Sequence, residues 1–266
     1  MTSPADTIER WLVDYVTTTS LAHKLHPPPR PSRWGGGAPA RMAAPGRPPE
    51  LVVEARARKR PRAGALVDPR RRAELFHTLL HHELQAAELF AWAALAFADA
   101  PASFRAGLLG VLDDEVRHLS MYREHLAELG AEIGDFPVRD WFWQRVPSCA
   151  SPLAFVSLMG LGLEGANLDH AARLADELRR AGDARGAEIA RQVGEEEIVH
   201  VKFAKVWFER WAGPLLLDAW ARELPAPLSP ALLRGVPMDV EARRRAGFDD
   251  EFLRRLAACE LAPRGS

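Results

Sequence analysis

The chain has 266 residues, of which 47% are hydrophobic and 27% charged, and its formal net charge at pH 7 is −1. A chain of this length can bury one sizeable core, and the composition is typical of a soluble globular protein. The overall charge offers no strong excess for nucleic acid or an anionic membrane surface, and no apolar run is long enough to span a bilayer.

The cysteines and the N-terminus indicate the compartment. Cys149 and Cys259 are the only cysteines, too few for a disulfide framework, although the sequence permits one bridge between them. The first residues lack a basic stretch followed by an apolar block, so we expect no secretory signal. These observations predict a cytoplasmic protein with no membrane partner.

Residues 1–69 are predicted to form an N-terminal helix and a basic, proline-rich arm. Apolar residues at helical spacing indicate a short amphipathic helix over 4–24. From 26 to 69 the prolines and glycines exclude regular helix or sheet. The first seventy residues carry 12 Lys and Arg against 6 Asp and Glu, which leaves −7 for the remainder. The arm therefore either lies across the acidic body of its own protein or a neighbour, or is a solvated, partly disordered leader.

Residues 70–212 are predicted to form the main helical segment. Apolar residues repeat at the helical period, and prolines, glycines and capping residues mark the ends of four helices. We place these helices at 70–98, 102–130, 151–181 and 183–212. Short links make the first two and the last two into antiparallel hairpins.

A longer connection, 131–150, joins the two hairpins and contains the aromatic cluster Trp141, Phe142 and Trp143. This order of elements is typical of an all-α, ferritin-like four-helix bundle with one crossover. Residues 213–266 are interrupted by prolines, and we expect them to form short helices that pack over the bundle as a C-terminal extension.

Glutamates and histidines recur in the same order on the apolar faces of these helices. Each hairpin carries a lone Glu followed by a Glu-x-x-His pair: Glu83, Glu115 and His118, then Glu164, Glu197 and His200. The distance along the chain from the lone Glu to the paired Glu is 32 residues in the first hairpin (Glu83 to Glu115) and 33 residues in the second (Glu164 to Glu197). By the helical period, all six positions face the core.

Buried carboxylates need compensation, because an unpaired buried charge is strongly penalised or forced to protonate. Two divalent cations would balance the four glutamates. Oxygen and imidazole donors suit iron, manganese or zinc. The duplicated pattern therefore predicts a dinuclear metal centre in which iron is the first choice and manganese or a mixed Fe/Mn pair the alternative.

Two other acidic residues of the first long helix compete for a ligand role. Glu74 and His77 form a third Glu-x-x-His pair, but Glu74 lies about 180° around the helix from Glu83, so we expect Glu74 to face away from the site, at the surface. Glu88 is a closer competitor for the ligand position of Glu83, at about 140° around the helix. Its interval to Glu115 is only 27 residues, which breaks the match with the second hairpin.

The six-residue pattern resembles the ferritin-like di-iron carboxylate superfamily. The run from Asp114 to His118 looks like the Asp-Glu-x-Arg-His motif of its oxygen-activating members. The stretch from Leu75 to about Leu256, including GDFPVRDWFW, resembles an uncharacterised bacterial ferritin-like family. That family is similar in turn to the branch that contains a tRNA-modifying hydroxylase.

The resemblance implies roles for three further residues. Asp114 and Glu196 each precede a ligand glutamate, and in oxygen-activating relatives acids at these places orient the ligand histidines. The alternative is that both are exposed helix acids. Tyr122 has the offset of the radical tyrosine in the small subunit of class I ribonucleotide reductase, which makes it a candidate catalytic residue. The alternative for Tyr122 is a plain core position.

The leading functional hypothesis is an oxidase or oxygenase, a di-iron or Fe/Mn oxidoreductase that uses dioxygen or peroxide on an unknown organic substrate. Any reducing equivalents would come from an external reductase, because the sequence has no recognisable electron-transfer motif. Iron handling or peroxide removal of the ferroxidase kind, and tRNA hydroxylation, are the alternatives. The net charge argues against a nucleic-acid partner, and a homodimer is compatible with the sequence.

Overall fold

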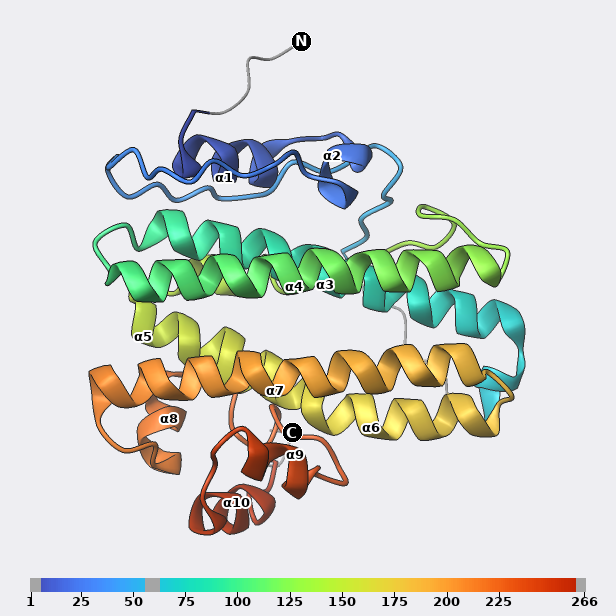
Figure 1. Ribbon diagram of the computed structural model, residues 1–266. Coiled ribbons are helices and arrows are strands. Elements are labelled where there is room, and N and C mark those ends of the chain that lie inside the picture. The colour runs from blue at the N-terminus through green and yellow to red at the C-terminus, as the bar shows by residue number, and fades with distance from the viewer. Residues whose placement is uncertain (1–5, 56–62, 262–266) are drawn as a thin grey trace. The chain divides into compact units, whose positions relative to one another are not determined.

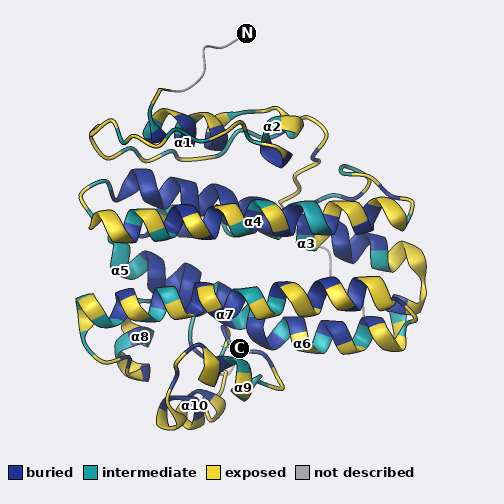
Figure 2. Ribbon diagram, in the orientation of Figure 1, coloured by how far each residue is buried: buried dark blue, intermediate teal, exposed yellow. Residues whose placement is uncertain are grey.

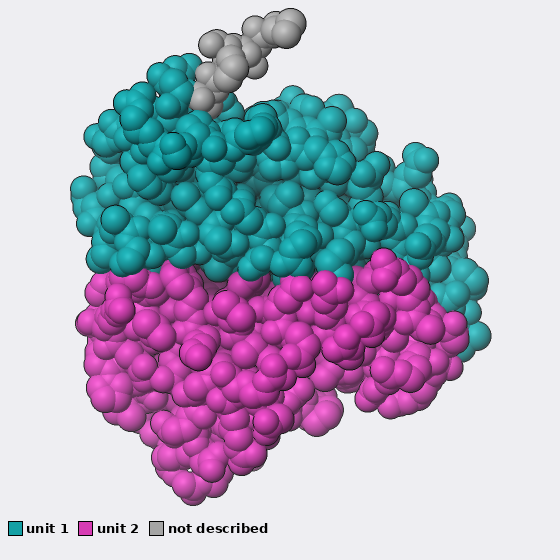
Figure 3. Space-filling view, in the orientation of Figure 1, with its two compact units in different colours: residues 1–148 teal, residues 149–266 magenta. Residues whose placement is uncertain are grey.

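The computed structural model describes residues 6–55 and 63–261, and these residues are all-helical, as the sequence predicts. The chain divides into two compact units, residues 1–148 and 149–266 (Figure 3). The boundary falls within the connection expected at 131–150. Within the described ranges the extended backbone forms one isolated parallel β-bridge, between Val53 and Val138, and no strand.

Unit 1 is built on a long antiparallel hairpin. Its helices are α3 (Pro69–Ala96) and α4 (Ala102–Glu128), which pack along each other (Figure 1). Asp68 caps α3 by accepting a hydrogen bond from the backbone N–H of Arg70 at 2.9 Å, and Pro69 occupies the first helical position. Figure 2 shows α3 buried along most of its length, whereas α4 presents an exposed stripe.

The N-terminal helix expected at 4–24 is two helices in the structure, so that boundary prediction is wrong for the described residues. These are α1 (Ile8–Thr17) and α2 (Leu21–Leu25). Thr18 adopts an extended conformation, and the hydroxyl of Ser20 caps the next helix by accepting from the N–H of His23. Hydroxyl side chains compete with the helical backbone for hydrogen bonds, and the run TTTS therefore ends one helix and starts another.

The proline-rich arm lies against the helices of its own unit. The indole N–H of Trp92 donates to the carbonyl of Met42 at 3.1 Å, and Arg30 forms an ion pair with Asp113 at 2.7 Å. The arm has no regular structure from 26 to 55 apart from the β-bridge residue, and a 3₁₀ turn, η1 (Ala63–Val67), leads into α3. Residues 56–62 of the predicted arm lie outside the described residues.

Unit 2 contains the second long hairpin. Its first arm runs through α5 (Pro152–Phe155), the π-helical segment η3 (Val156–Glu164) and α6 (Gly165–Arg180). Its second arm is α7 (Ala184–Ala212), which packs against both η3 and α6. The expected turn at 182–183 is present, with Gly182 at φ 81° and Asp183 capping α7. Helical spacing alone did not reveal η3, in which each turn is wider than in an α-helix.

The C-terminal segment folds onto the second hairpin as short helices, α8 (Leu217–Glu223), α9 (Val240–Arg245) and α10 (Asp250–Ala257). A buried ion pair anchors it, because both Arg243 and Asp169 are fully buried and their closest atoms are 2.7 Å apart. Cys149 and Cys259 are not joined by a disulfide bond. Among the described helices, none combines the length and the apolar content that crossing a bilayer requires.

Candidate metal centre

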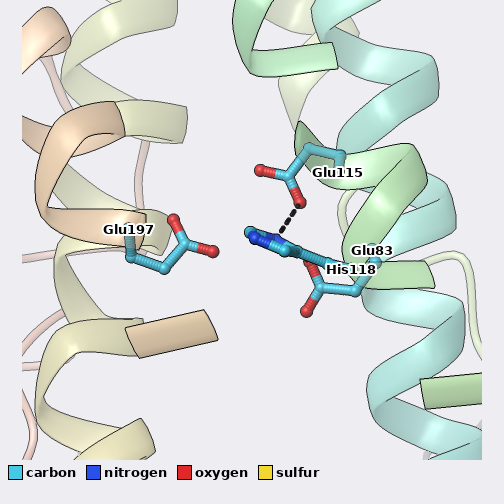
Figure 4. A group of neighbouring side chains, drawn as sticks. All are labelled: Glu83, Glu115, His118 and Glu197. Atoms are coloured by element: carbon cyan, nitrogen blue, oxygen red, sulfur yellow. Dashed lines mark ion pairs between the residues drawn. The ribbon is translucent and has the colours of Figure 1, made fainter. Parts of the chain in front are cut away.

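The hairpin of unit 1 brings three predicted ligands together. Glu83 comes from α3, and Glu115 and His118 lie one turn apart on α4 (Figure 4). His118 Nδ1 is 3.6 Å from Glu115 Oε2 and 3.7 Å from Glu83 Oε2. Each residue offers one ligand atom, and these atoms lie within 4.8 Å of one another. Figure 4 also draws Glu197, which belongs to unit 2.

Burial and mutual charge set the protonation of this cluster. Burial raises the pKa of Glu83 well above its ordinary value, and the charge of Glu115 raises it further. Burial lowers the pKa of His118, but the neighbouring acidic groups of Glu115 and Glu83 outweigh it and raise this pKa to about 11. The histidine ring and the two acidic side chains therefore retain protons within one buried cluster. A divalent cation fits the same place, because it would satisfy both carboxylates and release the histidine proton.

Unit 2 carries the matching set on its own hairpin. His200 Nδ1 lies 2.9 Å from Glu197 Oε2, and both residues are buried on α7. Glu164 is also buried and is the last residue of η3, the segment immediately before α6. Of the six predicted ligands, the structure thus clusters three in unit 1 and pairs two in unit 2, with Glu164 buried at the junction of η3 and α6.

Asn167 is a further candidate site residue, which the sequence analysis did not identify. Its Nδ2 donates to Glu197 Oε1 at 3.2 Å, whereas Oε2 of the same carboxylate faces His200. Asn167 lies in α6 three residues after Glu164, the last residue of η3, so about one helical turn separates the two residues. That spacing was the available signal, because an amide one turn from a ligand position can orient a ligand of the facing helix.

The structure separates Glu83 from its competitor Glu88. Glu88 Oε1 lies 2.7 Å from Lys24 Nζ and 2.6 Å from Arg47 Nη1, and its Oε2 accepts from the indole N–H of Trp143 at 2.8 Å. Glu88 is fully buried and compensated by two cations, so it has no need of a metal ion. Sequence periodicity could not reveal this, because both cations come from the N-terminal region.

The expectation that Glu74 lies at the surface is wrong. Glu74 and His77 are both buried, with His77 completely so, and the side chain of Glu74 pairs with Arg71 at 2.7 Å. His77 Nε2 accepts a hydrogen bond from the backbone N–H of Gly134 at 2.9 Å, and its ring contacts Phe136 edge-on. The connection after α4 covers this face of α3, which a helical projection of α3 alone does not show.

The three residues with implied supporting roles differ in burial. Tyr122 is buried, and its ring packs against Phe76 with centroids 5.8 Å apart. Asp114 is half-buried and forms an ion pair with Arg117, and Glu196 is half-buried and accepts from Gln192 at 3.1 Å. The orienting roles of Asp114 and Glu196 and the catalytic role of Tyr122 stay predictions.

Comparisons with known proteins place the chain among relatives without naming an activity. A protein of Haemophilus influenzae described as "Uncharacterized protein" is 28% identical over 191 residues, 68% of this chain and 66% of that protein. The chain thus covers slightly less than two thirds of that relative's length. The comparison with solved structures gave no significant match. Residues 6–254 match the family described as "Protein of unknown function (DUF455)", and the chain therefore belongs to this family.

Proposed function

We propose that the two ligand sets combine in one ferritin-like, dinuclear metal centre and that the protein is an oxygen-activating oxidase or oxygenase acting on an organic substrate. The observation that carries this proposal is the buried cluster of Glu83, Glu115 and His118 in unit 1. Its sequence pattern returns as Glu164, Glu197 and His200 in unit 2. A site duplicated in this way would hold one metal ion per set.

The donors support iron or manganese as the metal. Four carboxylates balance two divalent cations, and the two imidazoles add nitrogen donors of intermediate softness. The donor set contains no thiolate, because the two cysteines lie at positions 149 and 259, outside both sets. Two such ions, when bound, would together supply the two electrons with which dioxygen is activated.

The residues of the chain have separable tasks in this scheme. His118 holds a proton at Nδ1 between Glu115 and Glu83 and releases it when a cation takes that place. Asn167 fixes one carboxylate oxygen of Glu197, which leaves the other directed toward His200. Burial of these groups excludes bulk water, which strengthens their electrostatic interactions and protects reactive species from side reactions.

The test combines metal analysis with oxygen uptake. Protein purified without added metal is expected to contain two equivalents of iron or manganese per chain and to consume oxygen slowly without substrate. Two equivalents of zinc would contradict the redox proposal. Oxidation of many Fe(II) ions per chain with formation of a large assembly would replace it by a ferroxidase.

Matched variants assign the result to the proposed ligands. Glu115→Ala and Glu197→Ala are expected to lose dinuclear loading, because each removes a buried carboxylate from one set. Glu124→Ala in α4 and Glu195→Ala in α7 remove exposed glutamates from the same helices and should load normally. Full loading of both ligand variants would refute the assignment.

A further inference from the structure

The Arg–aromatic loop, residues 139–145 with the sequence RDWFWQR, is held rigidly against α3. Gln85 is completely buried, and its Nε2 donates to the carbonyl of Arg139 at 3.2 Å. Its Oε1 accepts from the backbone N–H of Phe142 at 3.1 Å. The nitrogen and the oxygen of this buried amide thus each bond to the loop backbone. Together they fix the loop conformation, because each broken hydrogen bond would leave a buried polar group unsatisfied.

Two side chains of the loop, Asp140 and Trp143, bond to partners inside unit 1, and Asp140 is the only carboxylate of the loop. Asp140 accepts from Arg47 Nε at 3.0 Å and lies 2.9 Å from His81 Nε2. Trp143 is buried and donates its indole N–H to Glu88. The negative charge of Asp140 is thus paired inside unit 1 and does not neutralise Arg139 or Arg145, the arginines at the two ends of the loop.

Arg139 and Arg145 remain at the partly exposed side of the loop. Arg139 Nη2 donates to the amide oxygen of Gln144 at 3.0 Å, and Arg145 Nη1 donates to the carbonyl of Trp141 at 2.9 Å. In the part of the chain that the structure describes, neither guanidinium forms an ion pair with a carboxylate. Burial lowers the pKa of Arg145, and the nearby charge of Arg139 lowers it further. The loop therefore carries a cation at each end that no carboxylate of the described residues neutralises.

Aromatic rings adjoin these two cations. The guanidinium of Arg145 lies 4.0 Å from the ring centroid of Trp141, and Trp141 meets Phe142 edge-on at 5.7 Å. Phe142 is stacked on His82 of α3 with centroids 5.0 Å apart. All of these side chains are half-buried, so each keeps part of its surface exposed, and the arginine groups can only donate hydrogen bonds.

We propose that the Arg–aromatic loop is a binding site for a nucleotide unit, a phosphate joined to a flat base. Arg139 and Arg145 would bind the phosphate, because guanidinium groups match its geometry with paired donors. The base would stack beside Trp141 and Phe142, as bases do on aromatic side chains and arginine planes. The net charge of −1 does not oppose this, because a local pair of unneutralised arginines determines the field at the loop.

The site is independent of the metal centre, since none of its residues belongs to the proposed ligand sets. A free mononucleotide and a single-stranded RNA present the same phosphate and base. Calorimetric titration of the full chain at low salt with adenosine 5′-monophosphate and with a short single-stranded oligoadenylate distinguishes the two sources. Benzoate, which carries a ring and a carboxylate but no phosphate, is the third probe.

We expect at least one of the two nucleotide probes to bind and both Arg139→Gln and Arg145→Gln to weaken that binding about tenfold or more, the scale of one charge-assisted hydrogen bond. Trp141→Ala should weaken it as well. Arg222→Gln, which removes an exposed arginine from α8, is the matched control and should bind like the wild type.

The possible results distinguish the two nucleotide sources from each other and from failure of the proposal. Binding of the oligonucleotide alone identifies single-stranded RNA as the source, and equal binding of the mononucleotide identifies a free nucleotide. No binding of either probe by the wild-type chain, binding of benzoate in preference to both, or unchanged affinity in the Arg139→Gln, Arg145→Gln double variant would overturn the proposal. Circular dichroism of each variant confirms that lost binding is not lost folding.

Discussion

His200 Nδ1 lies 2.9 Å from Oε2 of Glu197, one turn earlier on α7. The same two atom types of His118 and Glu115 face each other on α4 at 3.6 Å. In both hairpins a ring nitrogen and a carboxylate oxygen therefore converge on the buried side of one helix. This local repetition is the structural counterpart of the sequence repeat and supports the proposal that each hairpin supplies an equivalent half of one metal centre.

Glu88→Ala is predicted to destabilise the protein strongly. The substitution leaves the fully buried ammonium of Lys24 without its carboxylate partner, and removing one member of a buried ion pair costs about 3–5 kcal/mol. Urea unfolding measures the change in the free energy of unfolding. Glu188→Ala, which breaks an exposed pair with Arg191 on α7, is the control and should leave the midpoint unchanged. Equal stability of the two variants would show that the buried network contributes little.

Asn167→Leu is predicted to weaken metal binding without preventing folding. The amide of Asn167 holds one oxygen of Glu197, and loss of a hydrogen bond to a ligand typically lowers metal affinity about 10–100-fold. Titration against a competing chelator measures the affinity. Asp176→Leu changes an exposed polar side chain on α6 and should have no effect. An unchanged affinity in Asn167→Leu would remove Asn167 from the site.

His77 is predicted to make the protein less stable as the pH falls from neutral. Burial lowers the pKa of His77 to about 4, so the unfolded chain binds a proton between about pH 6.5 and pH 4 that the folded chain does not. The neutral ring makes its full contribution to the free energy of unfolding above pH 6.5, and this contribution declines as the pH falls toward 4. At pH 5 the loss reaches about 2 kcal/mol. Protonation of Nε2 would also break its hydrogen bond from Gly134.

Urea unfolding at pH 7.5 and pH 5 measures this effect in the wild type and in His77→Phe. We expect the free energy of unfolding to change less between the two pH values in the variant than in the wild type, because the variant lacks the contribution of His77. His81, whose pKa is lowered chiefly by burial, supplies part of the remaining dependence. Identical pH dependence in the two proteins would show that His77 does not change its protonation on unfolding in this range.

Gly160→Ala is predicted to destabilise unit 2. A Cβ atom at this position would overlap the Cβ of Ala204 on α7, and overpacking of this kind costs about 1–3 kcal/mol. Gly110→Ala on α4 meets no atom within 4 Å and should stabilise the chain by about 0.5–1 kcal/mol. Thermal unfolding compares the two. Adding Ala204→Gly should restore most of the stability lost in Gly160→Ala, and failure to do so would point to strain elsewhere in η3.

The sequence was sufficient for the features that depend on local periodicity. The four long helical segments and the inward direction of Glu83, Glu115 and His118 follow from the spacing of apolar residues on single helices. The turn at Gly182 also follows from its local sequence. Each of these features is determined by residues within a few turns of one another.

Features that depend on distant partners were not predictable in this way. Glu88 is compensated by Lys24, which lies 64 residues earlier in the chain, and no periodicity links the two. The burial of His77 requires the connection that carries Gly134, and the role of Asn167 requires α7 to face α6. The π-helical turns of η3 form in a glycine-rich stretch whose apolar pattern also fits an α-helix.

The most direct test of the account is anomalous diffraction at the iron edge from crystals of the full chain grown with Fe(II). We predict two peaks separated by roughly 3.5–4 Å, one held by Glu83, Glu115 and His118 and the other by Glu164, Glu197 and His200. Crystals with ample iron but no peak at these six side chains would contradict the claim of a dinuclear centre, as would a single peak.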